Sequence, residues 1–179
     1  MRIRSKWFKD KEHTLDEEAG AISNNLWRIG MNVMLNLENA DYQTESNKQR
    51  LEAIGEILAF CIHITDRKTI ENFDDEARNV FISALAQKCA KSLGDNYYEL
   101  YGKGTYKEDF INLLNDRMAE YSEFDFLEDG PSFGMKRYFG EYMSKRMGDR
   151  HNKWVASQII DIEVPQMMKT INRILVNLS

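Results

Sequence analysis

The sequence has few of the residues that interrupt helices or crosslink chains. It contains 2 prolines and 2 cysteines among 179 residues, and its longest unbroken apolar run extends only from Ile57 to Ile62. Scarce proline favours long helices, because proline in a helix interior removes a backbone donor. Two cysteines exclude a disulfide-dense scaffold. The short run predicts no transmembrane segment, because a spanning helix needs roughly 20 apolar residues.

The two cysteines, Cys61 and Cys89, lie in apolar stretches with helical spacing. We therefore expect buried free thiols, as found in a reducing compartment. The first residues are basic, but the apolar segment of a secretory signal does not follow them. The sequence therefore predicts a cytoplasmic protein.

Strand-like alternation is also missing, and apolar residues recur at spacings of three and four along the chain. Capping residues predict helix starts near Thr14, Ser46, Asn72 or Asp74, Thr105, Ser132 and Asn152. The expected fold is all-α, a compact bundle of about six or seven helices. We expect a single helical-bundle domain over residues 14–179, preceded by an extended basic arm over residues 1–13.

Glycine and proline positions predict where helices end or bend. Gly94 is expected to stop the third helix, which leaves an irregular tyrosine-rich stretch from Asp95 to Tyr106. Pro165 is expected to kink the last helix or to restart it, because its ring crowds the carbonyl of Asp161.

Charge is distributed unevenly. The net charge of −5 disfavours nucleic-acid binding by the whole chain, because that affinity comes mainly from neutralised phosphates. The first eleven residues nevertheless carry five bases against the single acid Asp10. The arm residues that could contact a partner are Arg2, Arg4, Lys6, Trp7, Lys9 and Lys11. One hypothesis is therefore an accessory protein that binds nucleic acid or a membrane surface through this arm.

The first expected helix carries apolar residues on two sides. One stripe runs from Leu15 to Leu37, and a second patch consists of Trp27, Met31, Met34 and Leu35. A helix that is apolar on two sides is buried on two sides, either inside the bundle or at an oligomer interface. We take this second patch as the interface candidate. It favours a non-enzymatic protein that acts as a homo-oligomer or by binding a protein partner.

No motif with known catalytic or cofactor chemistry occurs in the sequence. The Glu-x-x-His pairs of di-iron bundles, the Gly-x-Ser-x-Gly of hydrolases and the haem-attachment motif are absent. We assign no catalytic residue and no cofactor. The best candidate metal ligands are Glu56, His63 and Asp66 on the second helix. On a helical wheel they share a polar stripe with Glu52 and Arg67, so a solvated helix face is expected there instead.

A third hypothesis is a small-molecule-binding protein or enzyme with a pocket between helices. Tyr97, Tyr101, Arg28 or Arg146 would supply its polar contacts. Arg146 projects onto a face predicted to be buried, where an arginine must either extend to solvent or pair with a carboxylate. We expect that carboxylate in the acidic segment Glu120–Asp129.

Three segments carry a resemblance. They are Arg2-Ile3-Arg4-Ser5-Lys6-Trp7-Phe8, Trp27-Arg28-Ile29 and Ile160-Asp161-Ile162-Glu163-Val164-Pro165. The chain resembles uncharacterised bacterial helical proteins of similar length. This resemblance implies an all-helical fold over most of the chain, and it implies no activity and no site residues.

Overall fold

The computed structural model describes residues 12–148, 150 and 152–178, and the side chains of residues 12–14, 152 and 177 are not described. The arm candidates Arg2, Arg4, Lys6, Trp7, Lys9 and Lys11 lie outside the described residues. The first described helix begins at Glu12.

Helices make up nearly all of the described chain, and the predicted all-α fold is confirmed. The helices are α2 (Glu12–Asn39), α3 (Asn47–Thr69), α4 (Asp75–Tyr101), α5 (Tyr106–Ser122), α6 (Phe133–Met147), α7 (Asn152–Gln158), a π-helical turn (Ile159–Glu163), α8 (Val164–Leu175) and a 3-10 turn (Val176–Leu178). Between α5 and α6 lies a small antiparallel hairpin of β1 (Phe126–Leu127) and β2 (Gly130–Pro131).

Three helix starts follow from side-chain caps. The Ser46 hydroxyl accepts from the Gln49 backbone N–H at 3.1 Å, and the Asp74 carboxylate accepts from that of Ala77 at 2.9 Å. Ser132 caps α6 in the same way, through Met135 at 3.3 Å. Each cap satisfies a backbone donor that the helix itself leaves unpaired. The starts predicted at Ser46, Asp74 and Ser132 are confirmed.

The predicted stop at Gly94 is wrong, because α4 continues to Tyr101. A Cβ at Gly94 would lie 2.8 Å from Cγ of Lys107, so the missing side chain makes room for α5. The helix ends at Gly102, whose φ of 76° and N–H bond to the Tyr98 carbonyl at 2.8 Å form the actual stop.

The bend expected at Pro165 takes the form of a π-helical turn within one continuous helical stretch from α7 to α8. The Val164 N–H bonds to the Ile159 carbonyl, five residues back. The wider turn accommodates a proline without ending the helix. Side-chain amides of Gln158 and Asn36 hold Glu163, the last residue of this turn, at 3.0 Å each.

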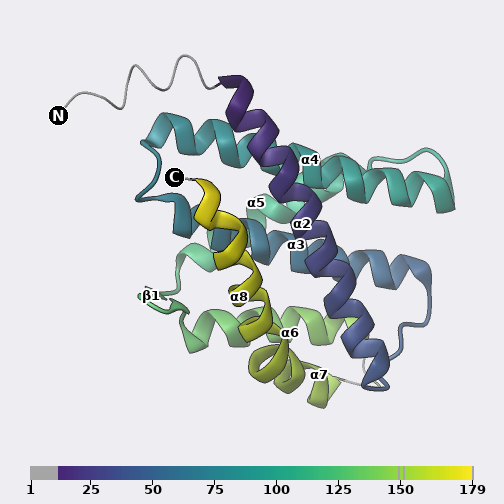
Figure 1. Cartoon of the computed structure of the whole chain (residues 1–179). Helices are drawn as coiled ribbons and strands as arrows, with labels where there is room; N and C mark the ends of the chain where they lie inside the picture. Colours follow the sequence, from purple (N-terminus) through teal and green to yellow (C-terminus); the bar gives the residue numbers. More distant parts are fainter. Residues whose placement is uncertain (1–11, 149, 151, 179) are drawn as a thin grey trace.

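Helix α3 is the centre of the bundle and contacts α2, α4, α5, α6 and α8. It lies between α4 and α6, and α2 and α8 cross in front of it (Figure 1). Its residues from Ala53 to Thr65 are all buried. Phe60 on α3 stacks on Phe139 of α6 with ring centroids 4.1 Å apart.

In the described part of the chain, no helix is both long enough and apolar enough to cross a membrane.

The second apolar patch of α2 is largely covered by the same chain. Met34 is fully buried, and Trp27 and Met31 are half-buried against the core. Arg50 of α3 extends over Met31 and donates to its sulfur at 3.7 Å. Leu35, with 50% of its surface exposed, is the member of the patch that faces solvent.

Candidate functional site

A buried group of charged side chains joins α3, α5 and α6. Glu56 is fully buried, and its carboxylate accepts two hydrogen bonds from Arg117, Nε to Oε2 at 2.8 Å and Nη2 to Oε1 at 2.9 Å. Arg146 donates to Oε1 from Nε at 3.1 Å, and its Nη2 lies 3.0 Å from the same oxygen in an ion pair. Two guanidinium groups therefore share one carboxylate. We call Glu56, Arg117, Arg146, Glu120 and Tyr142 the Glu56 cluster.

Two further contacts complete the surroundings of Arg117. Its Nη1 pairs with Glu120 at 2.9 Å, and its guanidinium carbon lies 3.3 Å from the ring centroid of Tyr142. Burial alone would lower the pKa of Arg117, but the hydrogen bond and the charge of Glu56 outweigh that effect and raise it. The cluster thus fixes a charged guanidinium inside the bundle.

The solvated face expected on α3 is wrong for Glu56 and His63, both of which are buried. The candidate metal ligands are each held by an arginine. Glu56 binds Arg117 and Arg146, His63 accepts from Nε of Arg67 at 3.3 Å, and Asp66 pairs with Arg78 at 3.0 Å. In the described part of the chain, no group of three His, Cys, Asp or Glu residues could hold a metal ion.

The predicted partner of Arg146 is also wrong. Its carboxylate comes from Glu56 on α3 and not from the segment Glu120–Asp129. Glu120 of that segment reaches the cluster through Arg117. Arg146 on the apolar face of α6 meets both alternatives expected for it, because it pairs with a carboxylate and 32% of its side chain stays exposed.

The exposed side of Arg146 faces a pocket of about 390 Å³ between α3, α4 and α5. Its lining is Lys48, Leu51, Glu52 and Gly55 of α3, Leu93 and Tyr97 of α4, Tyr106, Asp109, Phe110 and Leu113 of α5, and Arg146 of α6. Leu51, Leu93 and Phe110 are buried and form an apolar floor. Ionisable groups surround that floor.

Two tyrosines form one wall of the pocket. The rings of Tyr97 and Tyr106 stack with centroids 4.8 Å apart and an interplanar angle of 12°. Burial, and secondarily the carboxylate of Glu52, raises the pKa of Tyr97 to about 12, and Arg146 acts in the opposite direction. The Tyr97 hydroxyl thus lies within the electrostatic reach of both Glu52 and Arg146.

Of the four polar pocket residues expected from the sequence, Tyr97 and Arg146 line this pocket, whereas Tyr101 and Arg28 are exposed elsewhere. Lys48, Glu52 and Asp109 were not predicted. Glu52 had a usable signal, since it lies one helical turn before Glu56 on the same stripe of α3.

A second cavity of about 490 Å³ lies where the α2–α3 connection meets the end of α6. Its lining is Gln43, Thr44, Glu45, Gln49, Met147, Gly148 and Arg150. Among the described residues that line it, Met147 is the one large apolar side chain, so this cavity resembles a polar surface hollow more than a ligand site.

The thiols of Cys61 and Cys89 are free and buried, as predicted. Burial raises the pKa of Cys61, and the neighbouring Cys89 raises it further. Burial also raises the pKa of Cys89 to about 12. Both remain protonated near neutrality and are therefore poor nucleophiles.

His63 is buried next to Tyr121, with ring centroids 5.4 Å apart. Since Arg67 donates to its Nε2, the neutral ring carries its proton on Nδ1. Within the described residues, Nδ1 of His63 and the hydroxyl of Tyr121 have no hydrogen-bond partner. Burial, and secondarily the charge of Arg67, lowers the pKa of His63 to about 4.

This shift predicts acid sensitivity between about pH 6.5 and pH 4. The folded chain keeps His63 neutral there, whereas the unfolded chain protonates it, so the unfolded state binds more protons. The free energy of unfolding should fall by about 2–3 kcal/mol as the pH drops through this window, and His63 should contribute no further loss below it. Urea denaturation at several pH values should show a flatter profile for His63→Gln. Parallel profiles for the two proteins would contradict the assignment.

Comparison with known proteins adds no assignment. A scan against protein-family models, a search of curated proteins and a search of solved structures each give no match to this chain. The resemblance to bacterial helical proteins therefore stays a prediction. What the chain does has to be argued from its own geometry.

Proposed function

We propose that this chain is a binding protein for a small, partly apolar ligand, which it holds in the pocket between α3, α4 and α5. Ligand sites in proteins are typically concave, about 300–1,000 Å³ in volume, and apolar with a few convergent polar groups. A pocket of about 390 Å³ with Leu51, Leu93 and Phe110 as its floor fits that description.

The observation that carries the proposal is the support given to Arg146. A long side chain at a pocket wall normally loses rotamer freedom when it binds a ligand, and this loss weakens affinity. Glu56 already holds Arg146 in place, and Arg117 in turn holds Glu56 from the buried side. The polar wall is thus preorganised before any ligand arrives, which is the arrangement expected of a binding site.

Gly55 offers a direct test, because it lies in the pocket lining. A Cβ there would meet Cδ2 of Leu93 at 3.5 Å and Cδ2 of Leu113 at 3.7 Å, which are ordinary contacts. The larger side chain in Gly55→Leu would therefore enter the pocket and fill part of it. Gly20→Leu on α2 is the matched control, because Gly20 lies outside the pocket and its nearest neighbour would be the stem of Lys88 at 3.8 Å.

The experiment is ligand-observed NMR on the full chain with a fragment set of amino acids, aromatic acids, aromatic amines and nucleosides. We expect at least one fragment class to bind, Gly55→Leu to weaken it at least tenfold, and Gly20→Leu to leave it unchanged. Circular dichroism confirms that both variants fold, and Gly55→Ala replaces Gly55→Leu if the latter does not. The proposal fails if no fragment binds, or if Gly55→Leu binds as well as the parent chain.

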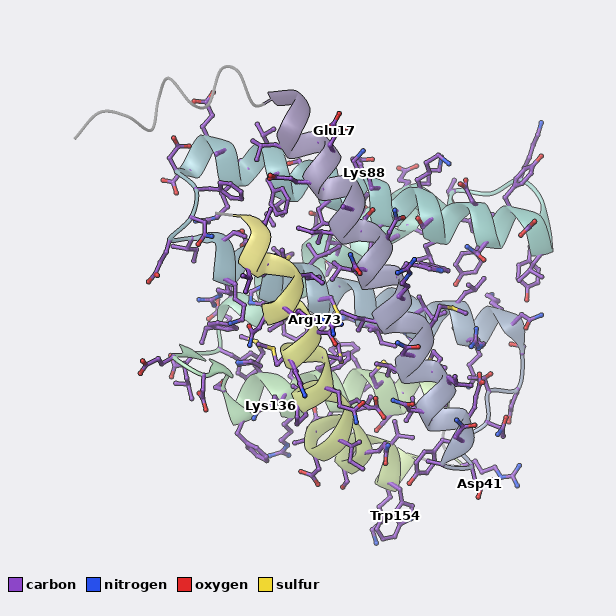
Figure 2. The ribbon with its side chains drawn as sticks, in the orientation of Figure 1. Glu17, Asp41, Lys88, Lys136, Trp154 and Arg173 are labelled. Atoms are coloured by element: carbon purple, nitrogen blue, oxygen red, sulfur yellow. The ribbon has the colours of Figure 1, made fainter. Side chains whose placement is uncertain are left out.

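Self-association stays a separate prediction. Its support is the exposure of Leu35 and of other apolar side chains, such as Trp154, which points away from the ribbon (Figure 2). Since Met34 is buried within its own chain, the patch predicted on α2 contributes less to that surface than expected. Light scattering coupled to size exclusion measures the subunit count directly, and a monomer at all concentrations would remove this hypothesis.

A further inference from the structure

The pocket lining contains an acidic side chain, Glu52, and a basic side chain, Arg146, that both affect the pKa of Tyr97 but do not pair with each other. Glu52 and Arg146 both act electrostatically on the Tyr97 hydroxyl, from α3 and α6 respectively. No ion pair in the described part of the chain joins Glu52 to Arg146 or to Lys48. A ligand that carries both charges can bind both groups at once.

Arg146 has one nitrogen left for such a ligand. Its Nε donates to Glu56 and its Nη2 forms an ion pair with the same carboxylate, whereas Nη1 makes no hydrogen bond within the part of the chain that the structure describes. Glu56 also accepts two bonds from Arg117, so it neutralises Arg146 only in part. Among ligand groups, a carboxylate is the best hydrogen-bond acceptor for the remaining N–H groups of a guanidinium.

The overall charge of the lining argues for a ligand with no net charge. The two bases, Lys48 and Arg146, match the two acids, Glu52 and Asp109. A simple anion would pair with Arg146 but would be repelled by Glu52, and a simple cation would meet the reverse problem. A zwitterion avoids both penalties because each of its charges lies next to the opposite charge.

The remaining surface of the pocket is apolar. Leu51, Leu93 and Phe110 form its floor, and the stacked rings of Tyr97 and Tyr106 form a flat wall. An aromatic or branched aliphatic body would bury its area against these residues. The pocket therefore combines charge recognition at one end with an apolar surface beside it.

We propose that the pocket binds a zwitterionic amphiphile, an α-amino acid with a large apolar side chain. Glu52 receives its ammonium group, Nη1 of Arg146 donates to its carboxylate, and its side chain lies on the floor formed by Leu51, Leu93 and Phe110. This inference rests on the proposed function, because it names the ligand class of the same pocket.

The test is isothermal titration of the full chain with three matched probes. L-Phenylalanine carries both charges, L-phenylalaninamide lacks the carboxylate, and 3-phenylpropanoate lacks the ammonium group. We expect L-phenylalanine to bind at least tenfold more tightly than either of the others, because each missing charge forfeits one charge-assisted contact.

Substitutions at Glu52 identify the groups involved. Glu52→Gln should weaken L-phenylalanine about tenfold and should improve the binding of 3-phenylpropanoate, because it removes the repulsion of an anion. Glu99→Gln is the matched control, since Glu99 is exposed on α4 outside the pocket and its loss should change neither affinity. Glu52 is half-buried and, among the described residues, makes no hydrogen bond or ion pair with the Glu56 cluster, so Glu52→Gln should retain the fold.

The outcomes separate this inference from the proposed function. The ligand class is overturned if 3-phenylpropanoate or L-phenylalaninamide binds as tightly as L-phenylalanine, or if Glu52→Gln leaves all three affinities unchanged. It is also overturned if none of the three binds while another fragment class binds and is blocked by Gly55→Leu; in that case the proposed function stands. If no fragment of any class binds, both proposals fail.

Discussion

Glu56→Ala is expected to lower the free energy of unfolding by about 3–5 kcal/mol, because it removes one partner of a buried ion pair. Arg117 is buried, and it would keep its charge without its two bonds to Glu56 at 2.8 and 2.9 Å. Arg146 would lose both of its bonds as well. Urea denaturation of the full chain, followed by circular dichroism, measures the difference from the parent chain.

Glu120→Ala is the matched control within the same cluster. Glu120 also pairs with Arg117, at 2.9 Å, but 36% of its side chain is exposed. Water can replace it, so its loss should cost less than about 1 kcal/mol. Equal losses in Glu56→Ala and Glu120→Ala would show that the arrangement on α3 is not a buried pair.

Replacing the whole pair separates its net contribution from the cost of breaking it. Glu56→Leu combined with Arg117→Met removes both fully paired charges, and it leaves only Arg146 and Glu120 without these partners, both of them partly exposed. Buried pairs exchanged for apolar residues of similar size are often neutral in stability. The double variant should therefore be more stable than Glu56→Ala, although it removes more polar contacts.

The same cluster shows what a single helix pattern can and cannot reveal. The stripe of Glu52, Glu56 and His63 on α3 is readable from spacing alone, but spacing does not say what covers it. Glu56 is covered by Arg117 and Arg146, which are 61 and 90 residues away in sequence, and His63 lies against Tyr121 of α5. The stripe was therefore predicted as solvated, although Glu56 and His63 are buried by residues of other helices.

The sequence contained one sign that another helix covers Glu56, namely Arg146, which lies on the apolar face of α6. Arg146 was predicted to extend to solvent or to pair with a carboxylate, because burying an unpaired guanidinium is costly, and it does both. The predicted source of the carboxylate was wrong, because Glu120–Asp129 is the nearest acidic segment in sequence, whereas α6 packs on α3 in space. The spacing of residues within one helix does not identify their partners on other helices.

Helix starts were predicted more accurately than contacts between helices, because a helix cap involves only residues that are close in sequence. Ser46 and Asp74 cap the helices that their sequence positions predict, since a cap bonds only a few residues away. The helix end predicted at Gly94 was wrong because glycine occurs both at left-handed helix ends and where two helices approach closely. At Gly94 the close neighbour is Lys107 on α5, so the second reason applies. The choice depends on a neighbour outside the helix.

Phe139→Ala is expected to cost about 3–5 kcal/mol, the usual range for a fully buried phenylalanine that leaves a cavity. Its ring lies 4.1 Å from that of Phe60 with an interplanar angle of 4°, and both side chains are fully buried. Phe60 also contacts Tyr121, with ring centroids 5.5 Å apart. The loss should appear as a lower denaturation midpoint with an unchanged slope.

Phe133→Ala supplies the control on the same helix, because 65% of the Phe133 surface is exposed and its removal should change stability by less than about 0.5 kcal/mol. The comparison holds the residue type and the helix constant and varies burial alone. If Phe139→Ala were as mild as Phe133→Ala, α6 would not be packed on α3 through this ring pair. Arg146 lies on the same helix, and the packing of α6 on α3 brings it to Glu56 and to the pocket. The placement of Arg146 in the pocket would then be contradicted as well.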